Sequence, residues 1–285
     1  MRHFDLLTLG NYSKEEILEL VNLAEKIKKN PERYENALRR KTLLMIFAKP
    51  SLRTHLSFDV GMYQMGGHAI YYDLGHSTLG EKESIKDFAN VVSRYVNIIM
   101  ARLYSQEELE ELAKYSNVPV INGLTNDYHP CQILGDLLTI KEKFGKLEGL
   151  KIAYVGDANN NVTHSLIQAC SKLEMNIIIS SPKNKNFMPN KNEIGNTKFT
   201  FVENPFEAVK NADIIYTDTW MSYQIQKSKE KFRIKVLKKY QVSSKLMGVS
   251  KKALFMHCLP ATRGHEVTDE VLDSNRSIVY DQAEN

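Results

Sequence analysis

The chain has 285 residues, which is enough for two domains of ordinary size. Charged residues make up 25% of the sequence and hydrophobic residues 42%, so a disordered, collagen-like or coiled-coil chain is excluded. The net charge of +4 gives no indication of a nucleic-acid partner. No apolar run reaches the ~18 residues that cross a bilayer, and no secretory signal follows Met1, so we expect no membrane partner and a cytoplasmic location.

Cysteines and one basic run complete the compositional picture. Cys131, Cys170 and Cys258 are an odd number without C-x-x-C spacing, which indicates neither a disulfide framework nor a structural zinc site. Residues 227–239 hold seven Lys or Arg and one Glu. Because no series of aromatic residues accompanies this run, we predict a solvent-exposed helix face or loop there.

The first half of the chain alternates amphipathic and apolar segments. Ser13 and Glu16 have capping-box spacing, so a helix is predicted to begin there and to end at Asn30. Further helices are predicted over residues 51–65 and 83–94, and another from Ser105 onward. Short apolar runs between them predict buried strands at residues 42–47, 68–72, 97–101 and 118–122.

A long helix is predicted to follow His129 and to end at Gly145, and we expect it to connect two domains. The second half repeats the alternation, with predicted strands at residues 151–155, 176–180, 199–202, 213–217, 253–258 and 277–280. The sequence therefore predicts an α/β fold of two doubly wound parallel-sheet domains, residues 1–135 and 136–285, joined by an interdomain helix.

The segment after the first predicted strand has the groups of an anion site. In open α/β sheets, ligands bind beyond the carboxyl ends of the strands. Ser51, Arg53 and Thr54 stand there at a predicted helix start, where free N–H groups, two hydroxyls and a guanidinium suit a phosphate. An ordinary Ser cap beside an exposed Arg explains this segment equally well when it is taken alone.

Polar residues also follow the third and fourth predicted strands. Arg102 ends the third, and His129 and Gln132 come after the fourth, which puts a second cation, an imidazole and an amide at the same sheet edge. A capping or packing role is the ordinary alternative for His129. No GxxxxGK[ST] loop is present, so nucleotide phosphoryl transfer is disfavoured.

The strand ends of the second half carry groups suited to an amino acid. The segment before Asn161 lacks the GxGxxG glycines, so no dinucleotide cofactor is expected, and its three Asn residues alone favour an Asx turn with a helix cap. Asp218 is suited to an ammonium group, and Asn161 and Ser222 to a carboxylate. For Cys258, packing in the core is the commoner role of a free cysteine, and a thiol nucleophile is the alternative.

These segments, in this order along the chain, resemble the transcarbamylases, which are the aspartate/ornithine carbamoyltransferase family. The resemblance extends from Leu7 to Asn285. Ser-Leu-Arg-Thr-His at residues 51–55 resembles the family's Ser-Thr-Arg-Thr-Arg carbamoyl phosphate signature, and residues 129–132 resemble its His-Pro-x-Gln. Asp-Thr-Trp-Met-Ser at residues 218–222 and His-Cys-Leu-Pro at residues 257–260 resemble the ornithine enzymes. The aspartate enzymes carry a Pro-Leu-Pro-Arg type of segment at the latter place.

The resemblance implies transfer of the carbamoyl group of carbamoyl phosphate to the δ-amino group of L-ornithine, giving L-citrulline and phosphate. It implies no metal and no organic cofactor, a carbamoyl phosphate-binding first domain, an ornithine-binding second domain, and trimers or multiples of trimers. The implied catalytic residues are Arg53, Arg102, His129, Gln132, Asp218 and Cys258. The implied contacts are Ser51, Leu52, Arg53, Thr54, Arg102, His129, Gln132, Cys258 and Leu259 for carbamoyl phosphate, and Asn161, Asp218, Ser222 and Tyr223 for ornithine.

Several departures from the family pattern keep two further hypotheses open. Tyr223 and Gln224 replace a Met and a Gly in the loop expected to close over ornithine, so an acylated ornithine or another amine is an alternative acceptor. Thr78 stands where many relatives have Gln or His reaching into a neighbouring subunit. His55 replaces the second Arg of the signature, and relatives continue past Asn285 with an Arg that contacts substrate. These two features motivate the other hypothesis, a non-catalytic paralogue.

Overall fold

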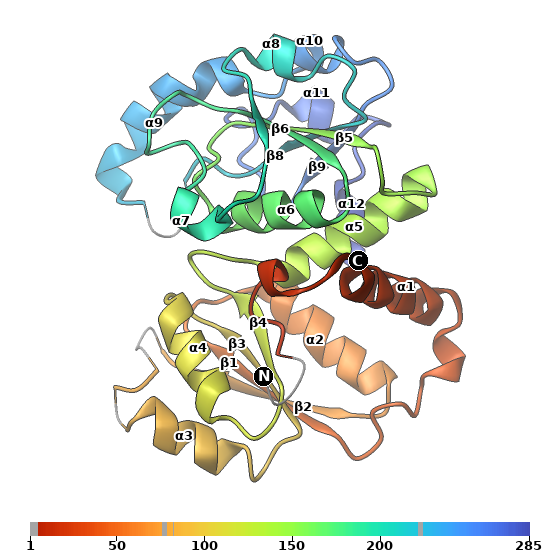
Figure 1. Ribbon diagram of the computed structural model, residues 1–285, viewed down its shortest axis with the longest axis vertical. Helices are drawn as coiled ribbons and strands as arrows, with labels where there is room; N and C mark the ends of the chain where they lie inside the picture. Colours follow the sequence, from red (N-terminus) through yellow and green to blue (C-terminus); the bar gives the residue numbers. More distant parts are fainter. Residues whose placement is uncertain (1–4, 76–78, 82, 222–224) are drawn as a thin grey trace. The chain divides into compact units, whose positions relative to one another are not determined.

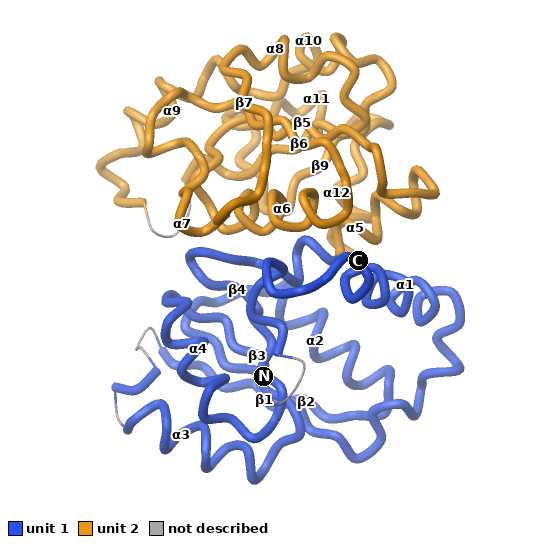
Figure 2. The backbone as a smooth tube through the Cα atoms, viewed as in Figure 1, with its two compact units in different colours: residues 1–134 blue, residues 135–285 orange. Residues whose placement is uncertain are grey.

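The computed structural model describes residues 5–75, 79–81, 83–221 and 225–285 and divides into two compact units, Met1–Leu134 and Gly135–Asn285 (Figures 1 and 2). Each unit holds one sheet in which every strand pairing is parallel. Helix α5, Pro130–Phe144, runs across the division. The predicted α/β class with two parallel sheets is confirmed.

The first unit has a four-stranded sheet in the order β2-β1-β3-β4. Its strands are β1 Thr42–Phe47, β2 His68–Asp73, β3 Ile98–Arg102 and β4 Val120–Leu124. Its helices before α5 are α1 Lys14–Lys29, α2 Leu52–Gln64, α3 Ile85–Val92 and α4 Gln106–Tyr115, with short 3-10 helices at Leu9–Asn11 and Pro31–Arg33. All four predicted strands are present, and their bounds differ from the predicted ones by two residues at most.

Strand β1 shows why this sheet is covered on both faces. Leu44 and Ile46 pack in a core cluster with residues of α3 and α4, whereas Met45 and Phe47 pack in a second cluster that contains Met62 of α2. Successive side chains of a strand point to opposite faces, so these two clusters lie on opposite sides of the sheet. A strand buried on both sides requires the continuous apolar run seen in the sequence.

Helix caps position the segments that matter for the site. The predicted capping box of α1 is formed: the Ser13 N–H donates to Glu16 Oε2 at 2.7 Å, and the Glu16 N–H donates to Ser13 Oγ at 3.1 Å. Ser51 caps α2 in the same sense, because its Oγ accepts from the Thr54 N–H at 3.4 Å. The cap holds both hydroxyls beside the first turn of α2.

The second unit has a five-stranded sheet in the order β7-β6-β5-β8-β9. Its strands are β5 Lys151–Val155, β6 Asn176–Ser180, β7 Thr200–Phe201, β8 Ile214–Thr217 and β9 Leu254–His257. Its helices after α5 are α6 Asn161–Lys172, α7 Lys191–Ile194, α8 Pro205–Ala208, α9 Glu230–Leu237, α10 Ser244–Met247, α11 Asp269–Leu272 and α12 Val279–Glu284, with 3-10 helices at Lys227–Lys229 and Lys238–Tyr240.

One predicted strand of the second unit, residues 277–280, is wrong. Ser277 forms a single isolated bridge with Phe255, and the chain then turns into α12. The helix brings Gln282 back to the sheet, where its Oε1 accepts from the His257 N–H at 2.9 Å and its Nε2 donates to Asp136 Oδ1 at 2.8 Å. These buried hydrogen bonds outweigh the strand propensity of the Ile-Val-Tyr sequence.

Candidate active site

Side chains from two segments meet at the carboxyl edge of the first unit's sheet. Arg102, the last residue of β3, is 6% exposed, and its Nη1 donates to Thr54 Oγ1 at 3.4 Å. The Ser51 hydroxyl also donates to Thr54 Oγ1, at 3.0 Å. The structure thus brings three predicted residues together from two segments that lie far apart in the sequence.

Lys49 lies beside this group, although the sequence analysis did not single it out. The residue is only 2% exposed; its Nζ donates to Asn126 Oδ1 at 2.7 Å and lies 4.4 Å from the centre of the Tyr104 ring. Burial, reinforced by the nearby Arg102 guanidinium, lowers the pKa of the Lys49 ammonium to about 8. Lys49 stands two positions after the buried strand β1 and two positions before Ser51, and this place in the sequence is the signal that points to it.

His129 completes this part of the site. The residue is half-buried at the start of α5, directly before Pro130. Burial, together with the Arg102 and Lys49 cations, lowers the pKa of the imidazole to about 3, so the ring is neutral near pH 7. A neutral imidazole has one N–H to donate, which suits it to a ligand oxygen. We call Lys49, Ser51, Thr54, Arg102 and His129 the donor cluster.

The remaining predicted residues of the first unit are placed differently. Gln132 is half-buried in the first turn of α5. Leu52 and Arg53 are exposed in the first turn of α2, so the two buried cations of the donor cluster are Lys49 and Arg102. His55 stacks on the Tyr71 ring, with centroids 4.5 Å apart, and its Nε2 lies 4.0 Å from Asp59 Oδ2 on the next turn of α2.

In the second unit, Cys258 and Asp218 are in direct contact. The Cys258 Sγ donates to Asp218 Oδ1 at 2.9 Å, and the same carboxylate oxygen accepts from the Thr219 N–H at 2.7 Å. Asp218 is buried and directly follows β8, whereas Cys258 is half-buried after β9. Cys258 is therefore not a core-packing cysteine but one partner of a polar pair at a strand edge.

A buried network supports the backbone next to Cys258. Leu259 has a positive φ of 55°, and its N–H donates to His257 Nδ1 at 2.8 Å. The other ring nitrogen, Nε2, lies 3.3 Å from Glu266 Oε1, which also accepts from the Thr262 N–H. Asp218, His257 and Cys258 have the spacing of a metal site, but both nitrogens of His257 are engaged in these contacts, so the ring is not available to a metal ion.

The loop between β5 and α6 has the predicted Asx geometry. Asp157 Oδ1 accepts from the Asn159 N–H at 3.1 Å, and Asn160 caps α6 by accepting from the Thr163 N–H at 2.8 Å. Asn161 is half-buried as the first residue of α6. Ser222 and Tyr223, the other predicted ornithine contacts, lie outside the described residues, as do Thr78 and Gln224.

Comparison with known families decides the chain's membership. Family models match two stretches: the aspartate/ornithine carbamoyltransferase carbamoyl-P binding domain over residues 4–142, and the Asp/Orn binding domain over residues 148–285. The chain belongs to the aspartate/ornithine carbamoyltransferase family. The resemblance inferred from the sequence is thereby confirmed.

Individual members of the aspartate/ornithine carbamoyltransferase family match along the whole chain. The ornithine carbamoyltransferase of Caldicellulosiruptor saccharolyticus is 47% identical and aligns with 100% of this chain and 94% of its own length. The ornithine carbamoyltransferase of Methanocaldococcus jannaschii is 45% identical and aligns with 98% of this chain and 94% of its own length. The solved ornithine carbamoyltransferase from Pyrococcus furiosus superposes with a TM-score of 0.92 at 44% identity, over 98% of this chain and 92% of that one.

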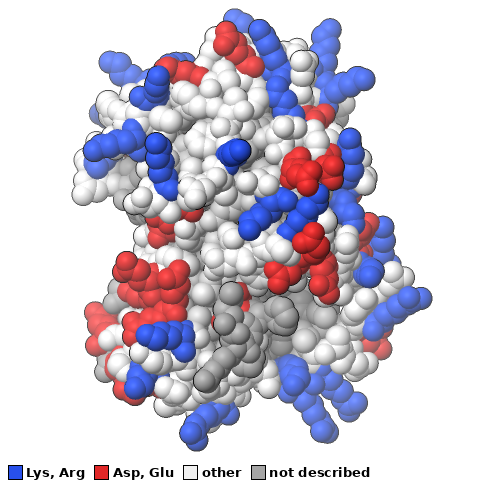
Figure 3. Space-filling view, in the orientation of Figure 1, with Lys and Arg blue, Asp and Glu red and all other residues white. Residues whose placement is uncertain are grey.

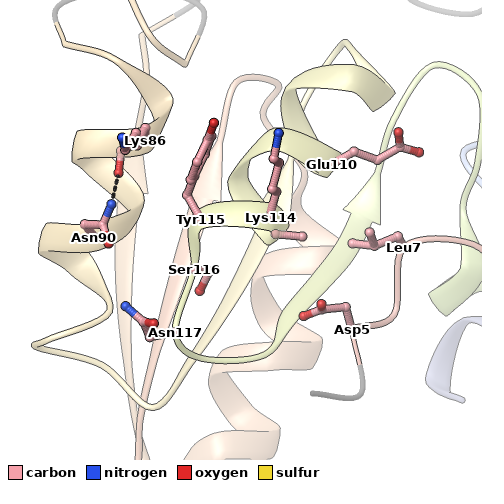
Figure 4. Close-up of a pocket in the computed structure, with 10 residues that line it drawn as sticks. Asp5, Leu7, Lys86, Asn90, Glu110, Lys114, Tyr115, Ser116 and Asn117 are labelled. Atoms are coloured by element: carbon pink, nitrogen blue, oxygen red, sulfur yellow. Dashed lines mark hydrogen bonds between the residues drawn. The ribbon is translucent and has the colours of Figure 1, made fainter. Parts of the chain in front are cut away.

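A surface pocket of about 650 Å³ in this carbamoyltransferase is separate from the donor cluster (Figure 4). Lys86 of α3 and Lys114 of α4 flank the Tyr115 ring there, with Nζ-to-centroid distances of 5.7 and 5.2 Å. Ser116, which also lines the pocket, lies just before β4, whereas the donor cluster lies after the strands. The pocket is thus at the opposite edge of the sheet.

Within the described residues, no helix is long and apolar enough to span a membrane.

Proposed function

We propose that this carbamoyltransferase transfers the carbamoyl group of carbamoyl phosphate to the δ-amino group of L-ornithine, producing L-citrulline and phosphate. The observation that carries the proposal is the Cys258–Asp218 pair, 2.9 Å apart, in a chain that matches ornithine enzymes along its whole length. The His-Cys-Leu-Pro segment that holds Cys258 differs from the segment of the aspartate enzymes, so ornithine is the favoured acceptor.

The donor cluster is suited to a small dianion. Lys49 and Arg102 supply charge, and Ser51, Thr54 and the free N–H groups of the first turn of α2 supply hydrogen bonds to phosphate oxygens. We propose that Arg53 adds an exposed guanidinium at the rim. Arg102, Gln132 and the neutral His129 are proposed to donate to the carbamoyl oxygen, where negative charge develops as the amine attacks.

The second unit is proposed to prepare the acceptor. The δ-ammonium must first lose a proton, because only the neutral amine has a lone pair. Asp218 and Cys258 are proposed to orient that nitrogen, while Asn161 and Asp218 hold the α-carboxylate and α-ammonium groups. The first ammonium proton passes to water, and the amine lone pair forms a bond to the carbamoyl carbon. The bond between that carbon and the phosphate oxygen breaks, and phosphate leaves with the electron pair. Phosphate accepts one of the two protons on the attacking nitrogen, and the other stays on Nδ of the citrulline.

A direct assay tests this proposal. The purified chain is given carbamoyl phosphate with L-ornithine, acetylornithine, succinylornithine or aspartate, and the carbamoylated products are quantified. We expect L-ornithine to give the highest kcat/KM. A preference for an acylated ornithine would change the assigned acceptor. Binding of carbamoyl phosphate without product, by a chain that circular dichroism shows to be folded, would favour a non-catalytic paralogue.

The affinity for carbamoyl phosphate is expected to fall as the pH rises above about 8, because Lys49 loses its charge there. The ammonium form attracts the dianion more strongly than the neutral form, so the fall is at most about tenfold per pH unit above that value. The KM for carbamoyl phosphate is measured between pH 6.5 and 9.5. A Lys49→Arg variant stays charged throughout, so the same fall in that variant would show that another group is responsible.

We also propose that copies of the chain assemble, as trimers or multiples of trimers. Leu52, Leu56, Val60 and Tyr63 are exposed along α2 at helical spacing, and Ile70, Tyr71 and Tyr72 are exposed on β2, an edge strand. An apolar helix face next to an unpaired strand edge is a common feature of a surface that another chain covers.

Disrupting this surface is expected to lower the mass of the assembly. A Val60→Asp variant places a charge in the centre of the exposed stripe on α2, and light scattering after size-exclusion chromatography measures the mass. Val91→Asp is the matched control, because Val91 is an exposed Val on α3. An unchanged mass for Val60→Asp would contradict the assignment of this surface.

A further inference from the structure

Arg233 is a buried cation in a helix whose other basic residues are exposed. Helix α9 lies within the basic run predicted to be a solvent-exposed face, and Lys and Arg side chains stand out from the surface around it (Figure 3). Arg233 departs from that prediction, with an exposure of 7%, whereas Lys231 and Lys235 are exposed. A long cation is rarely buried without partners, so its contacts indicate what it does.

The guanidinium of Arg233 contacts three segments outside its own helix. Its Nε donates to the Trp220 carbonyl oxygen at 2.8 Å, and its Nη2 forms an ion pair with Asp157. Its carbon lies 4.9 Å from the centre of the Phe187 ring. These partners follow β8, β5 and β6, so one side chain ties three loops at the carboxyl edge of the second sheet.

Two of these loops lead to residues proposed to bind the acceptor. Trp220 is two positions after Asp218, and Asp157 is four positions before Asn161. The Asp157 loop also bonds to the Phe187 loop, because the Ala158 N–H donates to the Phe187 carbonyl oxygen at 2.9 Å. A shift of the guanidinium therefore moves both the Asp157 loop and the Trp220 loop.

We infer that Arg233 is a positioning residue for the amino-acid acceptor, which sets the relative placement of Asn161 and Asp218 through the loops that it joins. This inference rests on the proposed function. Arg233 is not a catalytic residue, because its Nε and Nη2 contact protein groups. Only a guanidinium presents several donors in a fixed plane to a carbonyl and a carboxylate while its face lies on an aromatic ring; the compact ammonium of a Lys does not.

A purely structural role would affect both substrates equally, and the kinetics distinguish the two roles. In Arg233→Lys we expect the KM for L-ornithine to rise roughly 10-fold to 100-fold, since small displacements of positioning groups have effects of this size. The KM for carbamoyl phosphate, whose proposed phosphate contacts lie in the first unit, is expected to change less than about twofold. Lys235→Met, an exposed change on the same helix, is the matched control.

If Arg233→Lys folds poorly, Asp157→Asn is a second variant that tests the inference and keeps the shape of the site. It removes the charge that pairs with Arg233, and we expect the same selective rise in the KM for ornithine. Amide exchange supplies a readout that needs no turnover. The Ala158 and Asn159 N–H groups are expected to exchange faster in both variants, while the Leu166 N–H within α6 keeps the wild-type rate.

The outcomes separate this inference from the proposed function. If the wild-type chain forms citrulline but both variants keep the wild-type KM for ornithine, the inference is overturned and the proposed function stands. Equal rises in the KM for both substrates, or unchanged exchange at Ala158 and Asn159, also overturn it. If the wild-type chain forms no citrulline, the proposed function fails and the acceptor assignment of Arg233 fails with it.

Discussion

Replacing Arg102 with Met is expected to lower kcat for citrulline formation by roughly 100-fold to 1,000-fold, the usual effect of removing one donor from a site that stabilises a developing oxyanion. Arg102 is buried, and its guanidinium lies within hydrogen-bonding distance of Thr54 in the donor cluster. Steady-state kinetics with both substrates measures the loss. Arg94→Met is the matched control, because Arg94 is an exposed Arg of the same unit.

The same substitution is expected to leave the fold intact. Arg102 lowers the pKa values of both Lys49 and His129, which means that the guanidinium opposes positive charge on its neighbours. Its removal relieves this repulsion, so the melting temperature of the Met variant is expected to equal or exceed that of the wild type. The stabilisation that saturating carbamoyl phosphate gives the wild type is expected to shrink in the variant. A kcat within threefold of wild type would contradict the role of Arg102.

Much of the fold follows from local sequence patterns. Strands such as residues 42–47 are buried on both faces of a parallel sheet. Burial on both faces requires an uninterrupted run of apolar residues, and such a run can be recognised in the sequence. Residues 277–280 were misassigned because the helix that begins at Val279 depends on hydrogen bonds of Gln282 to distant residues. Such tertiary bonds leave no periodic signal in the sequence.

In the candidate site, too, some residues could be predicted from the sequence and others depend on tertiary contacts. Residues directly after strands are recognisable because parallel strands end at one edge, and the structure does bring Arg102 to Thr54 and Cys258 to Asp218. Lys49 also stands near a strand end, but its burial and that of Arg233 could not be predicted in this way, because burial of a cation depends on the packing of separate segments. Within α9, only the tertiary structure distinguishes the buried Arg233 from the exposed Lys235.

The second large effect is expected at Glu266. Glu266→Ala is expected to lower the free energy of unfolding by about 3–5 kcal/mol, the typical result of removing one partner from a buried, hydrogen-bonded pair. The side chains of Glu266 and His257 are both 0% exposed. The substitution leaves the His257 Nε2 and the Thr262 N–H without their acceptor and opens a void beside them, and each loss destabilises the folded state.

The stability loss and its effect on Cys258 are measured separately. Urea unfolding, followed by circular dichroism, gives the stability, with Glu270→Ala as the matched control because Glu270 is exposed on α11. Glu266→Gln keeps one acceptor oxygen and is expected to lose less stability than the Ala variant. Because His257 also accepts from the Leu259 N–H, a displaced ring moves the backbone next to Cys258, and kcat is expected to fall even where the Gln variant remains folded. A Gln variant with reduced stability and unchanged kcat would show that the network supports the fold alone, without positioning the thiol that contacts Asp218.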